Sequence, residues 1–124
     1  MTPRPKRLLQ GRPSTRGSVT AETAAVLPAL MIVLAAALWA IQAVAVQLQC
    51  VDAARTAARA AARGESLDEV RIEARSATRP DAQVEVSRDT EKTTVEIAVQ
   101  VRPAWGSVLP AVRVSASATA DTEP

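Results

Sequence analysis

A single acidic residue, Glu22, lies at the head of a long apolar run in the stretch RGSVTAETAAVLPALM, residues 16–31. A carboxylate at the mouth of a membrane helix is costly unless it is paired, faces lipid headgroups or is neutralised. Two roles fit this position. Glu22 reaches toward water from the start of a helix, where the helix dipole favours negative charge, or it meets a positive partner that arrives later.

The other reactive side chains do not form a catalytic set. The chain has no histidine and one cysteine, Cys50, which excludes His-based triads, His-containing zinc sites and an intrachain disulfide. The acidic pairs Asp68–Glu69 and Asp89–Glu91 are typical of solvated helix and turn charges. No glycine-rich phosphate loop, nucleophile motif or aromatic-basic patch is present in the sequence. We therefore expect no catalytic residue, metal, cofactor, small-molecule substrate or nucleic-acid partner.

The apolar run predicts a membrane-spanning helix. No residue from Thr23 to Val51 is charged, and this length exceeds the roughly 20 residues that a helix needs to cross a bilayer. Residues 1–17 carry five basic residues and no acidic one. The positive-inside rule then predicts a cytoplasmic N-terminus and an extracytoplasmic C-terminal domain. The expected location is the cell membrane, crossed once and in contact with lipid.

The helix is expected to continue beyond the membrane surface. The stretch QLQCVDAARTAARAAAR, residues 47–63, holds good helix formers, and Gly64 is a natural stop. Three arginines share one stripe of this helix, and small residues leave another face smooth: Arg55, Arg59 and Arg63 against Ala53, Ala57, Ala60 and Ala61. Either a neighbouring helix packs closely on the smooth face, or this segment is simply a solvated helix. One helix from Ser18 to Arg63 is expected, bent by Pro28 near its start.

The remaining residues form one small domain. Ser66 and Glu69 fit a capping box at the start of a short helix that ends before Pro80. Apolar and polar residues then alternate in three segments, 84–87, 95–101 and 112–118, and RDTEK, residues 88–92, joins the first two as an antiparallel hairpin. The expected fold class is α+β, with a long N-terminal transmembrane helix followed by a short helix on a three-stranded antiparallel sheet.

The core of this domain is expected to be thin. Hydrophobic residues make up 48% of the chain, but most are alanine and valine, and Trp39 and Trp105 are the only aromatic residues. Alanine buries little area, so stability depends on neighbours or on the long helix. Trp105 is expected to fill the core rather than to form an exposed contact. Cys50 is expected to be a small buried residue, with an intermolecular disulfide or lipidation as the alternatives.

The residues around Glu22 resemble the processing site of type IV prepilins. The stretch RG-SVTAE-TAAVLP has a basic leader, a glycine, and a hydrophobic helix with glutamate as its fifth residue. The fuller stretch GSVTAETAAVLPAL is similar to the TadE-like branch, the small pilin-like proteins of Tad (tight adherence, Flp-type) pilus systems. Gly17, Glu22 and Pro28 stand where that pattern puts them, whereas nothing apolar follows the other nearby glycine, Gly11.

The resemblance implies cleavage and assembly. A prepilin peptidase would cut the Gly17–Ser18 bond and create an amino group on Ser18, four residues from Glu22. In that family the glutamate of one subunit is thought to meet the N-terminal amine of another, and a desolvated ammonium and carboxylate attract strongly. The implied protein is a TadE-like minor pilin or pseudopilin, not an enzyme. Its partners would be the prepilin peptidase, other pilins and Tad pilus assembly proteins, in a pilus that serves adhesion or secretion.

This interpretation divides the chain into three segments: a cleaved basic leader over residues 1–17, a transmembrane and assembly helix over 18–64, and an extracytoplasmic α+β domain over 65–124. The alternative is an uncleaved single-pass membrane anchor whose outer domain binds an envelope partner. Cleavage distinguishes the two, because only the pilin interpretation requires Gly17.

Overall fold

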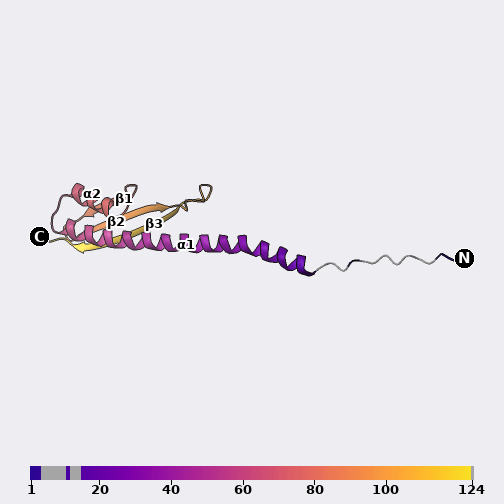
Figure 1. The fold of residues 1–124 in the computed structure, drawn as a ribbon. Helices are drawn as coiled ribbons and strands as arrows, with labels where there is room; N and C mark the ends of the chain where they lie inside the picture. The colour runs from indigo at the N-terminus through magenta and orange to yellow at the C-terminus, as the bar shows by residue number, and fades with distance from the viewer. Residues whose placement is uncertain (4–10, 12–14, 124) are drawn as a thin grey trace. The chain divides into compact units, whose positions relative to one another are not determined.

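A computed structural model describes residues 1–3, 11 and 15–123 of the chain. Helix α1 (Thr15–Ala62) is followed by helix α2 (Leu67–Ala77) and by strands β1 (Gln83–Arg88), β2 (Lys92–Val101) and β3 (Val112–Asp121) (Figure 1). The fold is α+β, as the sequence predicts. The chain divides into two compact units, Met1–Ala36 and Ala37–Pro124, and α1 contributes to both.

The second unit is built on a three-stranded antiparallel sheet in the order β1-β2-β3. Val86 lies opposite Val95, and Ile97 lies opposite Ala116. Because directly opposed residues share a face, the alternating apolar residues of the three strands form one apolar face. Its buried members are Val86, Val95, Ile97, Val99, Val101, Val114 and Ala116. The predicted strand periodicity and the predicted hairpin are both confirmed.

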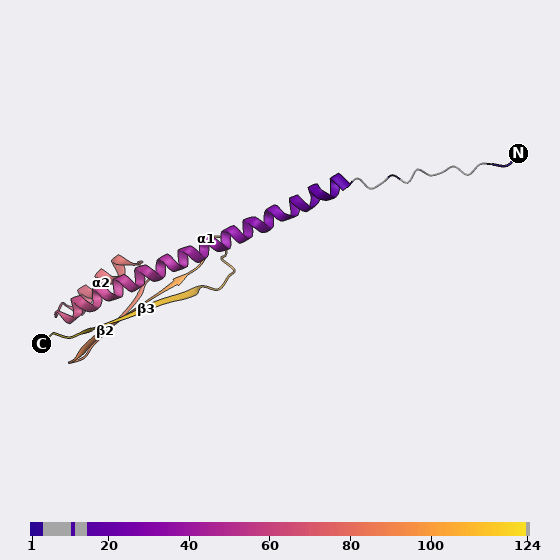
Figure 2. The ribbon, with the colours of Figure 1, turned by 90° about the horizontal axis from the view of Figure 1, so that it is seen from below.

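Helices α1 and α2 cover this apolar face of the sheet. Figure 2 shows α1 and α2 running along the sheet. One core cluster joins the buried strand residues to Val70 and Ala74 of α2 and to a stripe along α1. That stripe consists of Val46, Cys50, Ala53, Ala54, Ala57, Ala58, Ala60 and Ala61. Cys50 is fully buried, so the prediction of a small buried residue is confirmed.

Of the two roles expected for the smooth alanine face of α1, the solvated one is wrong. The chain's own helix α2 packs against this face, and so does its sheet, which the sequence did not predict as a partner. Alanine side chains are short, so they let the helix backbone come close to the sheet. The three arginines of the opposite stripe are exposed: Arg55, Arg59 and Arg63. The long helix therefore supplies much of the core that the small outer domain lacks.

The ends of the helices differ from expectation in detail. Helix α1 begins at Thr15 rather than Ser18 and ends at Ala62 rather than Arg63. Ser66 is the N-cap of α2, but its side chain makes no capping hydrogen bond. The carboxylates of Asp68 and Glu69, both in the first turn of α2, place negative charge near the helix N-terminus instead.

Trp105 does not fill the core. Its side chain is 60% exposed in the segment between β2 and β3. The space between helices and sheet is already occupied by the smaller side chains of the core cluster, among them Ile97, Val95 and Ala54. The expectation failed because the segment after β2 lies beyond the core cluster, whose last member on that strand is Val101.

The C-terminal end of α1 is held by Gly64 and Arg88. Gly64 has a φ of 90°, a left-handed conformation that favours glycine. Its N–H donates to the Ala61 carbonyl at 3.1 Å, and the N–H of Glu65 donates to the Ala60 carbonyl at 3.3 Å, which is the Schellman pattern of a helix end. The Arg88 guanidinium donates to the carbonyls of Ala61 and Glu65. The predicted stop at Gly64 is confirmed. The hydrogen bonds by which Arg88 of β1 holds the end of α1 were not predicted from the sequence.

Replacing Arg88 by methionine is expected to lower the free energy of unfolding of the second unit by about 1–2 kcal/mol, because two carbonyls lose a charged donor. Urea unfolding of the full chain in detergent, followed by circular dichroism, measures this loss. Arg55→Met is the matched control, since Arg55 is exposed on α1. Equal losses in the two variants would show that the Arg88 hydrogen bonds do not stabilise the fold.

Candidate functional site

The residues of the processing motif all lie on the N-terminal part of α1, in the first unit. Gly17 and Ser18 follow closely on the start of the helix at Thr15, and both are exposed. Glu22 is also exposed, and α1 continues through Pro28. Ser18 and Glu22 are four residues apart in a helix, so they share one face and lie about one turn apart. The helix therefore keeps the candidate cleavage bond and the carboxylate close together.

Glu22 is the only charged residue between Arg16 and Asp52. The two threonine hydroxyls beside it donate within the helix, Thr20 to the Arg16 carbonyl at 3.1 Å and Thr23 to the Val19 carbonyl at 2.9 Å. Within residues 1–3, 11 and 15–123, the Glu22 carboxylate forms no ion pair. The carboxylate is thus the only negative charge between Arg16 and Asp52, and it is exposed to a positively charged partner from another molecule.

The Gly17–Ser18 peptide bond lies in the first turn of α1. The first four N–H groups of a helix have no acceptor within it, and glycine in a helix is less favourable than alanine by roughly 0.5–1 kcal/mol. Both effects make this turn easy to unwind. An enzyme that needs an extended substrate could open it at small cost without disturbing the rest of α1.

Beyond Glu22, α1 exposes an apolar surface on all sides. Residues 16–62 form a helix long and apolar enough to cross a membrane, with a mean hydropathy of 2.5 in its most apolar window, none of which is buried. The large exposed side chains in the first unit include Val26, Leu27, Leu30, Met31, Ile32, Val33 and Leu34. A helix that is apolar all round requires lipid or other helices around it. The bend at Pro28 stays a prediction.

The Glu22 carboxylate can form an ion pair with another molecule, and the exposed apolar side chains of α1 can pack against lipid or other helices. In the part of the chain that the structure describes, no three His, Cys, Asp or Glu side chains could hold a metal ion. A groove of about 250 Å³ lies between the two helices of the second unit, and four alanines and four polar residues line it, the latter being Gln49, Asp52, Thr56 and Glu73. No nucleophile paired with a base lines this groove.

The chain was also compared with known proteins. The model of a family described as TadE-like protein matches residues 17–59. The matched range begins at the glycine of the candidate cleavage bond, includes Glu22 and Pro28, and ends within α1. No curated protein and no solved structure matches the chain.

Proposed function

Because the chain belongs to the TadE-like protein family through residues 17–59, we propose that it is a minor pilin or pilus assembly protein of a bacterial Tad pilus. The family implies a Tad pilus-associated protein with a long N-terminal hydrophobic helix. The finer proposal is that a prepilin peptidase removes residues 1–17 and that the subunit then assembles through α1. The observation that carries it is the lone carboxylate of Glu22, exposed one helical turn beyond the Gly17–Ser18 bond.

Hydrolysis of the Gly17–Ser18 bond consumes one water molecule and leaves a carboxylate on Gly17 and an ammonium group on Ser18. The five basic residues of the leader depart with the first fragment. The mature α1 then begins with a positive charge and carries one negative charge a turn later. The Ser18 ammonium of one such helix can then pair with the Glu22 carboxylate of another.

This ion pair would set the register of neighbouring subunits. An unpaired charge buried among apolar helices is heavily penalised, whereas the paired charges attract each other strongly in a medium of low dielectric constant. The exposed apolar side chains of α1 supply the remaining contact area, in lipid before assembly and between subunits after it. Glu22 is thus a residue of assembly, and the role of the protein is structural rather than catalytic.

In the membrane, the subunit would cross the bilayer once through α1, with residues 1–17 in the cytoplasm and residues 65–124 outside it. The basic residues before the apolar run and their absence within it support this orientation. The partners are then the prepilin peptidase, other pilins and Tad pilus assembly proteins, and lipid. The pilus would serve adhesion or secretion.

The mature N-terminus of the membrane-extracted protein tests this proposal most directly. Intact mass and N-terminal peptide sequencing are expected to show a chain that starts at Ser18. A chain that starts at Met1 or Thr2 would contradict processing and favour the other candidate, an uncleaved single-pass anchor whose outer domain binds an envelope partner.

A further inference from the structure

The segment that joins β2 to β3, residues 102–111, presents large apolar side chains to solvent. Trp105 is 60% exposed, Val108 96% and Leu109 46%. Apart from α1, the described residues of the second unit expose large apolar side chains only here, at the adjoining Val112 and at Ile72 of α2. A cluster of this kind at the end of a small sheet marks a contact surface rather than scattered exposure.

The segment is compact. The N–H of Gly106 donates to the Pro103 carbonyl at 3.0 Å, and the N–H of Leu109 donates to the Gly106 carbonyl at 2.9 Å. Gly106 is buried, and a side chain added there would come within 2.9 Å of both Pro103 and Leu109. Two consecutive turns thus fold the segment on itself, and Trp105 and Val108 are left on its outside.

Two hydrogen bonds fix where this segment lies along α1. Gln47 of α1 donates to the Ser115 carbonyl at 3.0 Å, and the N–H of Glu123 donates to the Ala62 carbonyl at 3.1 Å. Helix and strand therefore run in the same direction. From Gln47 to Ala62 the helix rises about 22 Å, which is close to the length of about 26 Å that an extended chain spans from Ser115 to Glu123.

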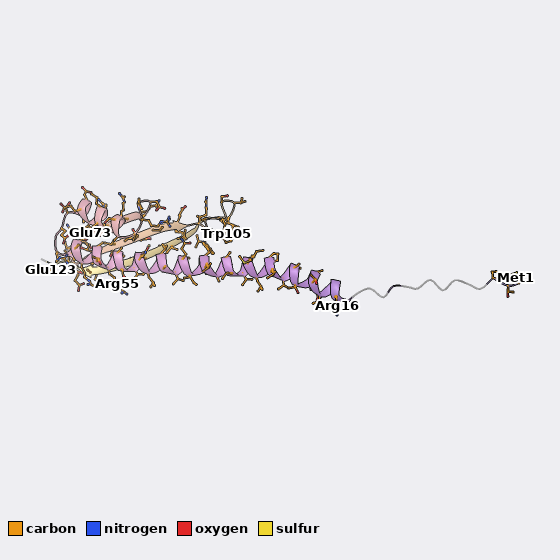
Figure 3. All side chains as sticks on the ribbon, in the orientation of Figure 1. Met1, Arg16, Arg55, Glu73, Trp105 and Glu123 are labelled. Atoms are coloured by element: carbon orange, nitrogen blue, oxygen red, sulfur yellow. The ribbon has the colours of Figure 1, made fainter. Side chains whose placement is uncertain are left out.

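The same geometry places the start of β3 near residue 40 of α1. Val112 lies about 10 Å before Ser115 along the strand, a distance equal to about seven helical residues counted back from Gln47. Figure 3 shows Trp105 at the end of the second unit opposite Glu123. This level is where the densest part of the apolar run ends, at residue 41. The other tryptophan, Trp39, stands there too, and its indole N–H is buried without a hydrogen-bond partner among the described residues.

The composition of this segment favours an amphipathic partner with anionic groups. Arg102, its first residue, is exposed, and the sequence holds no acidic residue between Glu96 and Asp121. Arg113, just after the segment, shares surface pockets with Asp81, Glu85 and Glu96, so its charge is balanced within the domain. A tryptophan, aliphatic side chains and an arginine are typical of a membrane–water interface, where indole N–H groups meet polar lipid atoms and arginines meet phosphates.

We propose that residues 102–111 insert into the headgroup region of the bilayer that α1 crosses. Trp105 and Val108 lie at the boundary with the acyl chains, and Arg102 lies at the lipid phosphates. The segment thereby holds the outer domain against the membrane surface while the subunit is unassembled. This inference rests on the proposed insertion of α1 in the membrane, and the two are separable by experiment.

The two tryptophans make the test direct, since the chain has no other aromatic residue. The full chain is reconstituted in vesicles of phosphatidylcholine and phosphatidylglycerol whose acyl chains carry bromine close to the headgroup, a short-range quencher of indole emission. The variant Trp39→Phe reports on Trp105 alone, and Trp105→Phe reports on Trp39 alone. Both are expected to lose emission in brominated vesicles relative to unbrominated ones, and Trp105 is expected to emit to the blue of a solvent-exposed tryptophan.

A third variant supplies the matched control. Ile72→Trp in a chain that lacks both native tryptophans places the reporter at the exposed apolar position on α2, a helix that lies beside Asp52–Ala57 of α1, far from residue 40. This reporter is expected to keep its emission. Equal quenching at positions 72 and 105 would overturn the proposal, because the whole domain would then lie on the membrane without preference for the loop.

The remaining outcomes separate this inference from the proposed function. If Trp39 is quenched and Trp105 is not, α1 is inserted and the loop proposal is wrong. If neither is quenched, membrane insertion itself fails, and the loop proposal fails with it. If the Trp105 blue shift depends on protein density rather than on lipid, the loop contacts a second copy of the chain, which also overturns the proposal.

Discussion

Gly17→Ala is expected to stop maturation, so that the protein extracted from membranes keeps residues 1–17. Two physical effects act together. The added methyl group displaces the scissile bond in a peptidase site shaped for glycine, and a misplacement of about 1 Å can slow an enzymatic step about 100-fold. Alanine also stabilises the first turn of α1 by roughly 0.5–1 kcal/mol relative to glycine, which opposes the unwinding that cleavage requires. Intact mass of the protein from cells that express a prepilin peptidase measures the outcome.

Gly11→Ala is the matched control for this variant. Gly11 also lies near the N-terminus, but it precedes α1, and a side chain added there meets no other atom within 4 Å. The Gly11 variant is expected to mature normally. Normal maturation of the Gly17 variant as well would remove the peptidase assignment and leave the uncleaved anchor as the better account of this protein.

Glu22→Gln is expected to leave membrane insertion and cleavage intact and to reduce incorporation into pili at least about tenfold, because a buried ammonium group that loses its carboxylate is strongly destabilised. Glutamine keeps the size and shape of the side chain and removes only the charge, so apolar packing of α1 is unchanged. Immunoblots that compare sheared pili with the membrane fraction measure incorporation and insertion in the same cells.

Glu69→Gln is the control for charge removal, since Glu69 is an exposed carboxylate in the first turn of α2. It is expected to enter pili at the wild-type level. Wild-type incorporation of the Glu22 variant would refute the ion-pair argument, because the register of the subunits would then depend on apolar contacts alone. A loss of the Glu22 variant from the membrane fraction would instead assign the carboxylate to insertion.

Some properties of this chain can be predicted from short stretches of sequence, because they depend only on residues that are neighbours in the chain. The apolar length of α1, the alternation of the three strands and the left-handed stop at Gly64 each depend on residues close together in the chain, and the structure confirms all three. The motif of Gly17, Glu22 and Pro28 is local in the same sense, and the family match begins at its first residue.

Other properties depend on which surfaces meet, and the sequence could not decide them. The periodicity of a stripe of alanines on a helix does not tell whether water, a second helix or a sheet lies against it. Only the tertiary structure shows that the chain's own sheet and α2 cover this stripe. Arg88 ends a strand without any local pattern, and its contact with Ala61 exists because the fold brings β1 to the end of α1.

Trp105 gives the clearest contrast. Composition favoured a buried indole, since the domain has few large residues. The segment that carries it lies beyond the residues that form the core, of which Val46 is the first on α1, and the ring is exposed together with Val108. Burial is a property of the space between elements, and that space is set by the side chains of both partners, which no single segment of the sequence specifies.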